Sequence, residues 1–200
     1  RSGLPAFAVV GLPDTAVQEA RERVRSGLVN QAFAVPAQRI VVNLAPADLR
    51  KVGPQYDVPI ALAILGASGQ LSSRALDGLG AVGELALDGS LRPLQGTLAM
   101  AEHAAARGWR RLVVPAPNAA EAALVPGIEV VPVTSLRHAV DVLEGRQPNV
   151  QPSVDPHRVL AEATAVGGHP DLIDVRGQHG ARRALEIAAA GAHSMLMLGP

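Results

Sequence analysis

Short apolar runs alternate with helix-patterned stretches along most of the chain. The runs have the length of strands and end at glycine, proline or polar residues; they are residues 6–12, 39–45, 111–115 and 128–133. Helical spacing of apolar residues, or an alanine-rich composition, marks residues 15–28, 58–67, 98–107, 118–124 and 136–144. Strands that alternate with helices are typical of an α/β fold, which we therefore predict.

Local signals mark the ends of several elements. Asp14 is placed to cap the first helix, and Asp57 is placed to cap the helix over residues 58–67. This second helix is apolar nearly all round, so we expect it to be buried on more than one side. Within residues 79–94, the dipeptide Asp88-Gly89 is the strongest hairpin signal of the sequence.

A change in composition divides the chain. We predict a first domain over residues 1–145 and an extended linker over residues 146–157, which is rich in proline and polar residues. Residues 158–200 then begin a second α/β domain. Its predicted elements are a helix over 159–165, a break over 167–170, a helix over 178–190 and a strand over 194–198, followed by Gly199-Pro200.

Composition limits the classes of function. Hydrophobic residues make up 48% of the chain but aromatic residues only 2%, so the core must be mainly aliphatic. Eighteen basic and eighteen acidic residues give no net charge, so nucleic-acid contacts would have to be local. The absence of cysteine excludes disulfides and thiolate chemistry. No apolar run is long enough to span a membrane, and we expect a cytoplasmic protein.

The polar loop over residues 43–59 contains the only lysine, Lys51. Arg50, Lys51 and Asp57 could contact a neighbouring subunit or a nucleic-acid backbone. The favoured alternative is a solvated loop in which Asp57 caps a helix, because short runs of mixed charge usually lie on the surface. Arg23 follows Glu19 by four residues, which predicts an exposed ion pair. The histidines lack metal-binding spacing, and no metal site is predicted.

Three segments in order carry a family resemblance. They are VGLPDTAVQE at residues 10–19, NLAPADLRKVGPQYDVP at residues 43–59 and GELALDGSLRP at residues 83–93. Together they closely resemble the ComM/YifB family of magnesium-chelatase-like AAA+ ATPases. The resemblance implies that residues 1–145 have a fold like the proteolytic domain of Lon, which is that of the second domain of ribosomal protein S-five. It also implies that residues 158–200 begin a P-loop AAA+ module truncated at its Walker A loop.

The resemblance also implies a nucleotide site. Residues 174–178 resemble the segment near the adenine, so Val175 and Gln178 are candidate cofactor-binding residues. Gly199 and Pro200 match the opening of the Walker A loop, in which backbone N–H groups and a lysine hold phosphates. ATP and Mg²⁺ are the implied cofactors of a longer, ring-forming protein. The 200 residues lack the Walker lysine, so we expect no ATPase activity from them alone.

A Lon-like fold raises the question of peptidase activity. Lon-type peptidases use a Ser–Lys dyad, in which the lysine takes the proton from the serine nucleophile. At the positions that match the family's dyad, this sequence has Gln55 after Gly53-Pro54, and Leu98. Neither side chain can do this chemistry, and a replacement dyad with Lys51 would need a distant serine such as Ser68 or Ser72. No catalytic residue is therefore predicted.

The sequence and the family resemblance together leave four candidate functions. The leading hypothesis, implied by the family, is an ATP-driven DNA motor for branch migration in natural transformation. The alternative is a non-catalytic interaction module that recruits DNA or protein to the ring. A magnesium chelatase subunit is less favoured, because authentic chelatase motor subunits generally lack the Lon-like domain. A Ser–Lys peptidase is disfavoured by Gln55 and Leu98.

Overall fold

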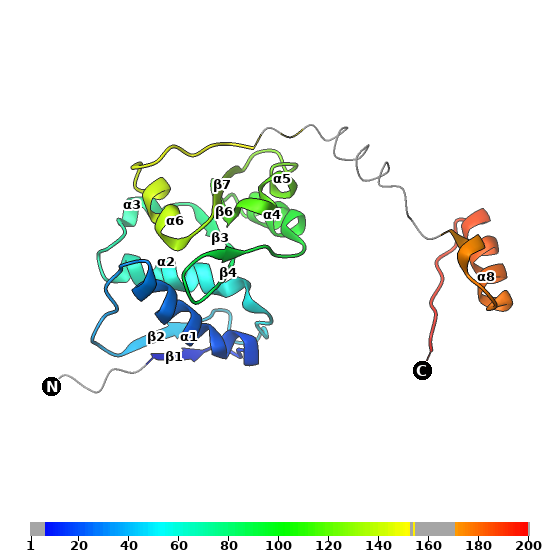
Figure 1. Cartoon of the computed structure of the whole chain (residues 1–200), viewed down its shortest axis with the longest axis horizontal. Coiled ribbons are helices and arrows are strands. Elements are labelled where there is room, and N and C mark those ends of the chain that lie inside the picture. The colour runs from blue at the N-terminus through cyan, green and yellow to red at the C-terminus, as the bar shows by residue number, and fades with distance from the viewer. Residues whose placement is uncertain (1–6, 153, 155–170, 200) are drawn as a thin grey trace. The chain divides into compact units, whose positions relative to one another are not determined.

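The chain divides into two units, residues 1–154 and residues 155–200, and each is described by itself. The structure is a computed structural model that describes residues 7–152, 154 and 171–199 (Figure 1). The helix predicted over 159–165 and the break predicted over 167–170 lie outside the described residues. None of the described helices is long and apolar enough to cross a membrane.

The first unit begins with a parallel β–α–β arrangement. β1 (Phe7–Val10) leads through α1 (Thr15–Asn30) to β2 (Ile40–Asn43). The two strands pair in parallel over their whole length. Asp14 caps α1 as predicted, since its Oδ1 accepts a hydrogen bond from the Val17 backbone N–H at 2.8 Å.

A three-stranded parallel sheet forms the other half of this unit. Its order is β3 (Leu79–Ala81), β6 (Arg111–Pro115), β7 (Glu129–Val133). Helices connect the parallel strands, α4 (Thr97–Ala106) before β6 and α5 (Ala119–Ala122) before β7. A last helix, α6 (Leu136–Leu143), follows β7. Parallel strands joined by helical crossovers confirm the predicted α/β class.

The predicted hairpin lies between β3 and α4. β4 (Glu84–Leu85) and β5 (Leu91–Arg92) pair in antiparallel fashion, with Asp88-Gly89 in the turn. Gly89 has a φ of +82°, a conformation that side chains disfavour. A Cβ at this position would also lie 3.0 Å from the Gly27 carbonyl oxygen of α1. The turn therefore needs glycine both for its backbone and for its close approach to α1.

Alternate residues of β6 and β7 face two separate hydrophobic clusters. Val113, Val131 and Val133 join the larger cluster, which also contains buried side chains of α1, α2 (Asp57–Ala67) and α6. Leu112, Val114 and Val130 join the smaller cluster beneath α4 and α5. The sheet is thus buried on both faces, which explains why these strands are continuous apolar runs in the sequence.

Helix α2 is central to the larger cluster. It follows a short 3-10 turn, η1 (Pro54–Tyr56), and is followed by α3 (Ser73–Leu76). In Figure 1, α2 lies between α1 with the β1–β2 sheet and the elements β3 and α6, and it contacts α1, α6, β3 and β4. Burial on several sides was predicted from its apolar composition and is confirmed.

Two predictions for the first unit need correction in detail. The helix predicted over residues 118–124 is shorter, because a 3-10 turn, η2 (Ala116–Asn118), precedes the single helical turn of α5. After α6, the side chains of Asn149 and Gln151 both donate hydrogen bonds to the Val130 carbonyl, at 3.1 and 2.8 Å. This part of the predicted linker is therefore bound to β7.

Residues 171–199 of the second unit contain one 3-10 turn and one helix. η3 (Leu172–Asp174) is closed by reciprocal capping between Asp171 and Asp174, and α8 (His179–Ala190) confirms the helix predicted over residues 178–190. The strand predicted over residues 194–198 is wrong for this structure, where these residues have no regular secondary structure. A strand needs a hydrogen-bonded neighbour, and the described residues of this unit provide none.

We predict that Leu65 of α2 contributes strongly to stability. Leu65 is completely buried, so Leu65→Ala should lower the free energy of unfolding by about 2–5 kcal/mol through lost burial and a residual cavity. Leu87→Ala is the matched control, since Leu87 is 59% exposed and its truncation should cost less than about 0.5 kcal/mol. Urea unfolding of both variants measures the difference, and equal effects would contradict the assignment of α2 to the core.

Candidate functional site

The loop over residues 43–59 is the centre of the candidate site, and Asp14 holds it against the start of α1. Asp14 Oδ2 accepts a hydrogen bond from the Gly53 N–H at 3.0 Å, while Asp14 Oδ1 caps the helix. The Asp14 N–H donates to the Lys51 carbonyl at 3.0 Å, and the Lys51 N–H donates to the Leu12 carbonyl at 3.1 Å. One carboxylate thus joins the first two sequence motifs.

Glycine at position 11 allows the two motifs to approach closely. Gly11 has a φ of +105°, and a Cβ there would collide with the Leu44 carbonyl oxygen. The Leu44 N–H donates to the Val10 carbonyl at 2.9 Å, which extends the β1–β2 pairing by one residue. The loop therefore begins as a continuation of the parallel sheet.

Asp57 forms a buried ion pair with Arg23 of α1. Its Oδ2 lies 2.6 Å from Arg23 Nε, and its Oδ1 lies 3.0 Å from Arg23 Nη2, which is the two-bond geometry that guanidinium groups favour with carboxylates. The Asp57 side chain is completely buried and also accepts the Leu85 N–H at 3.1 Å. Asp57 therefore connects α1, α2 and the third motif in β4.

This ion pair corrects two predictions. Asp57 was expected to cap a helix from a solvated loop, but it is the first residue of α2 and makes no cap to it. Arg23 was expected to form an exposed pair with Glu19; that contact is present at 3.7 Å, but the shorter bonds go to Asp57. Hydrogen bonding to Asp57 raises the pKa of Arg23 further above its usual value, so the guanidinium stays charged. Partners 34 residues apart leave no periodic signal in the sequence.

Lys51 is also buried rather than solvated. It is 5% exposed, and its Nζ donates a hydrogen bond to the Pro46 carbonyl within the same loop. Its backbone pairs with Pro13 in a bridge that fixes the residue against the start of α1. Lys51 and Asp57 are thus part of the framework, and of the three charged residues considered in this loop only Arg50 remains exposed.

The positions that would hold a Ser–Lys dyad contain no such chemistry. Gln55 uses its side-chain Nε2 to donate to the Val52 carbonyl at 2.7 Å, and Leu98 is partly exposed. Ser68 donates to the Leu65 carbonyl, and Ser72 accepts from the Ala75 N–H, so both serines are used in local turns. Among the described residues, Lys51 makes no hydrogen bond to a serine, and the arrangement gives no support to peptidase chemistry.

The third motif closes the loop from the other side. The Gly83 N–H donates to the Gln55 carbonyl at 3.0 Å, and the Val58 N–H donates to the Gly83 carbonyl at 3.1 Å. A Cβ at Gly83 would lie 2.6 Å from Val58 Cγ2, so a larger residue would separate the hairpin from α2. All three sequence motifs therefore meet in one network of backbone and carboxylate hydrogen bonds.

The predicted nucleotide-binding residues lie in the second unit. Val175 is 37% exposed, and its carbonyl accepts a hydrogen bond from Arg182 Nη1 of α8 at 3.2 Å. Gln178 has a left-handed backbone with a φ of +48° and precedes α8. Gly199 is exposed, and Pro200 lies outside the described residues. The structure thus brings Val175 and Gln178 to the start of one helix, and no hydrogen bond of the described residues joins them to Gly199.

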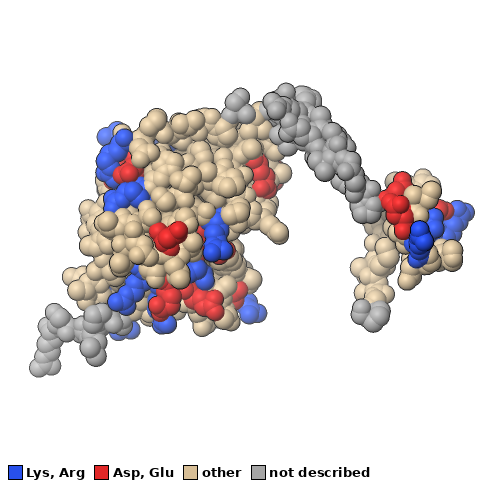
Figure 2. Space-filling view, viewed as in Figure 1, with Lys and Arg blue, Asp and Glu red and all other residues tan. Residues whose placement is uncertain are grey.

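One face of the first unit shows no broad surface of a single charge. On the face of the first unit seen in Figure 2, acidic and basic side chains are interspersed, and a group of basic side chains gathers over α3 and the end of α6. Within residues 7–152, 154 and 171–199, no group of three or more histidine and carboxylate side chains is placed to hold a metal ion. Local basic groups are therefore the candidates for contacts with anions.

Comparison with known proteins gives matches over the whole chain. The family model described as "Subunit ChlI of Mg-chelatase" matches residues 1–118, and that described as "Magnesium chelatase, subunit ChlI" matches residues 171–200. The protein YifB of Salmonella typhimurium is 43% identical over 199 residues, and the match covers 100% of this chain and 38% of YifB.

Two further relatives are similar to the same extent. YifB of Escherichia coli is 42% identical over 198 residues, covering 99% of this chain and 38% of the relative. Competence protein ComM of Haemophilus influenzae is 44% identical over 201 residues, covering 100% of this chain and 39% of ComM. The chain thus spans about two fifths of the length of these relatives.

Removing the charge of Asp57 should destabilise the first unit. Asp57→Asn keeps an acceptor for the Leu85 N–H but leaves Arg23 without its anion, and we expect a loss of about 3 kcal/mol in the free energy of unfolding. Asp48→Asn, in the exposed part of the same loop, should change it by less than about 0.5 kcal/mol. Denaturant titration measures both, and a small effect of Asp57→Asn would show that the pair contributes little.

Asp14 should make stability depend on pH in the acidic range. The hydrogen bond from the Val17 N–H holds the pKa of Asp14 below its ordinary value of 3.8. The ionised Asp14 carboxylate therefore stabilises the fold fully above pH 3.8, and this stabilisation is lost as the pH falls through the lower pKa that Asp14 has in the folded state. Between about pH 5 and about pH 2, wild type should lose more free energy of unfolding than Asp14→Asn, since asparagine is a neutral cap. Parallel pH profiles of the two proteins would contradict this role.

Proposed function

Because the chain belongs to the ComM/YifB magnesium-chelatase-like family, we propose that it is part of an ATP-driven AAA+ motor that acts on DNA. The observation that carries the proposal is the 44% identity to competence protein ComM over the whole chain. The substrate we propose is branched DNA during natural transformation. In this proposal the motor is a cytoplasmic homo-oligomeric ring.

The two units have different roles in this proposal. Residues 1–145 form a Lon-like domain without peptidase chemistry, and residues 158–200 begin the AAA+ module. Val175 and Gln178 contact the adenine of ATP, and Gly199 with Pro200 opens the Walker A loop that holds the phosphates with Mg²⁺. The position of Val175 and Gln178 at the start of α8 supports this assignment, since both are accessible to a ligand.

A second candidate function concerns the first unit by itself. The first two motifs carry exposed apolar side chains, with Leu12, Leu49 and Val52 each more than half exposed. Solvent-exposed apolar groups of this kind favour contacts with protein. The first unit would then be a non-catalytic interaction module that recruits a partner to the ring. Metal insertion into a porphyrin, which the name of the chelatase family suggests, is the less favoured alternative.

The motor proposal is tested with the longer protein to which we propose this chain belongs. We expect it to hydrolyse ATP and to move a four-way DNA junction only when ATP is hydrolysed, whereas the 200-residue chain should show no ATPase activity because it lacks the Walker lysine. In the longer protein, Val175→Asp should raise the KM for ATP by about tenfold or more, because a carboxylate beside the base costs desolvation and repels phosphate.

Ile173→Asp places the same charge two residues away, at a side chain that is 76% exposed, and should leave the KM for ATP within about twofold of wild type. Chelation of Mg²⁺ into a porphyrin without any effect on DNA junctions would overturn the motor proposal. Turnover of ATP by the 200-residue chain would overturn the assignment of the phosphate site.

A further inference from the structure

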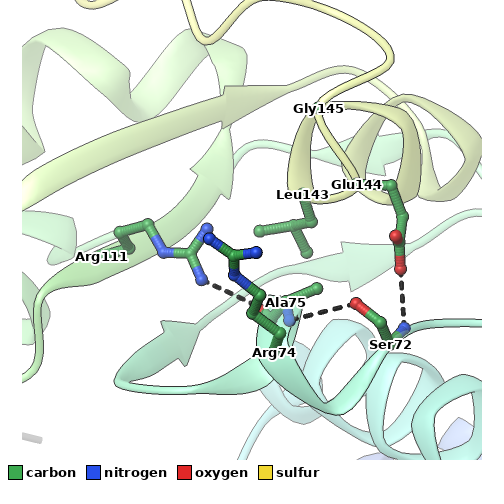
Figure 3. A pocket seen from close by; sticks show the side chains of 7 residues that line it. All are labelled: Ser72, Arg74, Ala75, Arg111, Leu143, Glu144 and Gly145. Carbon is green, nitrogen blue, oxygen red and sulfur yellow. Dashed lines mark hydrogen bonds between the residues drawn. The ribbon is translucent and has the colours of Figure 1, made fainter.

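A pocket of about 580 Å³ lies between α3, the start of β6 and the end of α6 (Figure 3). It belongs to the first unit and is separate from the loop over residues 43–59. Two arginines line it, Arg74 from α3 and Arg111 from β6, and the same two arginines border an adjoining hollow beside Arg110. The pocket thus has two cations contributed by segments that are far apart in the sequence.

The two guanidinium groups point toward each other in this pocket (Figure 3). Arg111 Nη2 donates one hydrogen bond to the Ala75 carbonyl at 2.8 Å. Among the residues that the structure describes, neither Arg74 nor Arg111 has a carboxylate within ion-pairing distance, and the Arg74 side chain makes no hydrogen bond. Two like charges that converge on one pocket repel each other unless an anion lies between them.

The carboxylates around the pocket are already bound by other groups. Asp77 pairs with Arg110, and Glu129 accepts a hydrogen bond from Asn149 at 2.7 Å. Glu144 lines the pocket, but it accepts the Ser72 N–H at 2.6 Å and points to Ser72 in Figure 3. This hydrogen bond lowers the pKa of Glu144, so Glu144 is an anion at neutral pH and keeps its hydrogen bond to Ser72. The donors of Arg74, and those of Arg111 that do not bind the Ala75 carbonyl, remain available for an external acceptor.

We propose that Arg74 and Arg111 bind a phosphate-type oxyanion in this pocket. Each planar guanidinium can donate two parallel hydrogen bonds to a phosphate, which relieves the repulsion between the two arginines. The phosphate comes from one of two sources, a free phosphate compound or the phosphodiester backbone of a nucleic acid. The inference does not depend on the motor proposal, because the pocket lies wholly within the first unit.

The experiment uses the 200-residue chain with two probes, pyrophosphate and a short DNA duplex. Arg74→Gln is the principal variant, because the Arg74 side chain makes no hydrogen bond among the described residues and its loss should leave the fold intact. We expect Arg74→Gln to weaken, by about tenfold, the binding of whichever of the two probes the wild-type chain binds. Arg107→Gln is the matched control, since Arg107 is exposed at the end of α4 and does not line the pocket; it should leave the affinity unchanged.

A second variant, Glu144→Gln, should bind the phosphate probe more tightly than wild type. Glu144→Gln keeps an acceptor for the Ser72 N–H and removes a negative charge from the pocket wall, so it should strengthen binding by about twofold or more. Binding of pyrophosphate identifies a free phosphate compound as the ligand, and binding of the duplex alone identifies the nucleic-acid backbone. Binding of neither probe, or equal affinity of wild type and Arg74→Gln, would overturn the proposal.

Discussion

The buried ion pair between Asp57 and Arg23 is the interaction on which the rest of the first unit depends. Asp57 is completely buried, and its two oxygens accept hydrogen bonds from Arg23 and from the Leu85 N–H. A carboxylate without partners in this position would be strongly unfavourable, because burial removes its hydration. Asp57 therefore links α1, α2 and β4 through hydrogen bonds that satisfy its buried charge.

This constraint also explains why the polar loop between β2 and α2 has a structural role. Asp14 accepts a hydrogen bond from the Gly53 N–H, and Lys51 donates one to the Pro46 carbonyl, so these two charged side chains satisfy backbone groups of the loop itself. Gln55 and Leu98 stand at the positions that the family resemblance gives for a Ser–Lys dyad, and neither side chain can act as a nucleophile or a base. Among the described residues of the first unit, the exposed apolar groups of the loop and the two arginines of the α3–β6 pocket are accessible to a partner or ligand.

The second unit differs from the first, because its described residues bury few of their apolar side chains. Helix α8 has no buried residue, and Ile187 is 54% exposed. Leu196 and Leu198 in the apolar run after α8 are 82% and 90% exposed. Apolar side chains at helical spacing and in a strand-like run are typical of segments that pack within a larger core. Exposed apolar groups of this kind favour contacts with other protein surfaces.

The sequence by itself determined the local elements of this protein. The apolar runs predicted β1, β2, β6 and β7, the helical spacing predicted α1, α2, α4, α6 and α8, and Asp88-Gly89 predicted the hairpin, because these features depend on neighbouring residues. The motifs over residues 10–19, 43–59 and 83–93 were sufficient to indicate the family. The strand over 194–198 was not formed, since pairing requires a partner that local pattern does not supply.

Only the tertiary structure decided what the charged residues do. Asp57 and Lys51 lie in a stretch whose polar composition is typical of an exposed loop. Packing of α2 against α1 nevertheless buries Asp57, and the backbone bridge to Pro13 fixes Lys51. Arg74 and Arg111 are unremarkable in sequence, and the fold of α3 against β6 places them in one pocket. The physical reason is the same in each case: partners many residues apart meet only after the core has formed, so their pairing depends on the fold and not on local spacing.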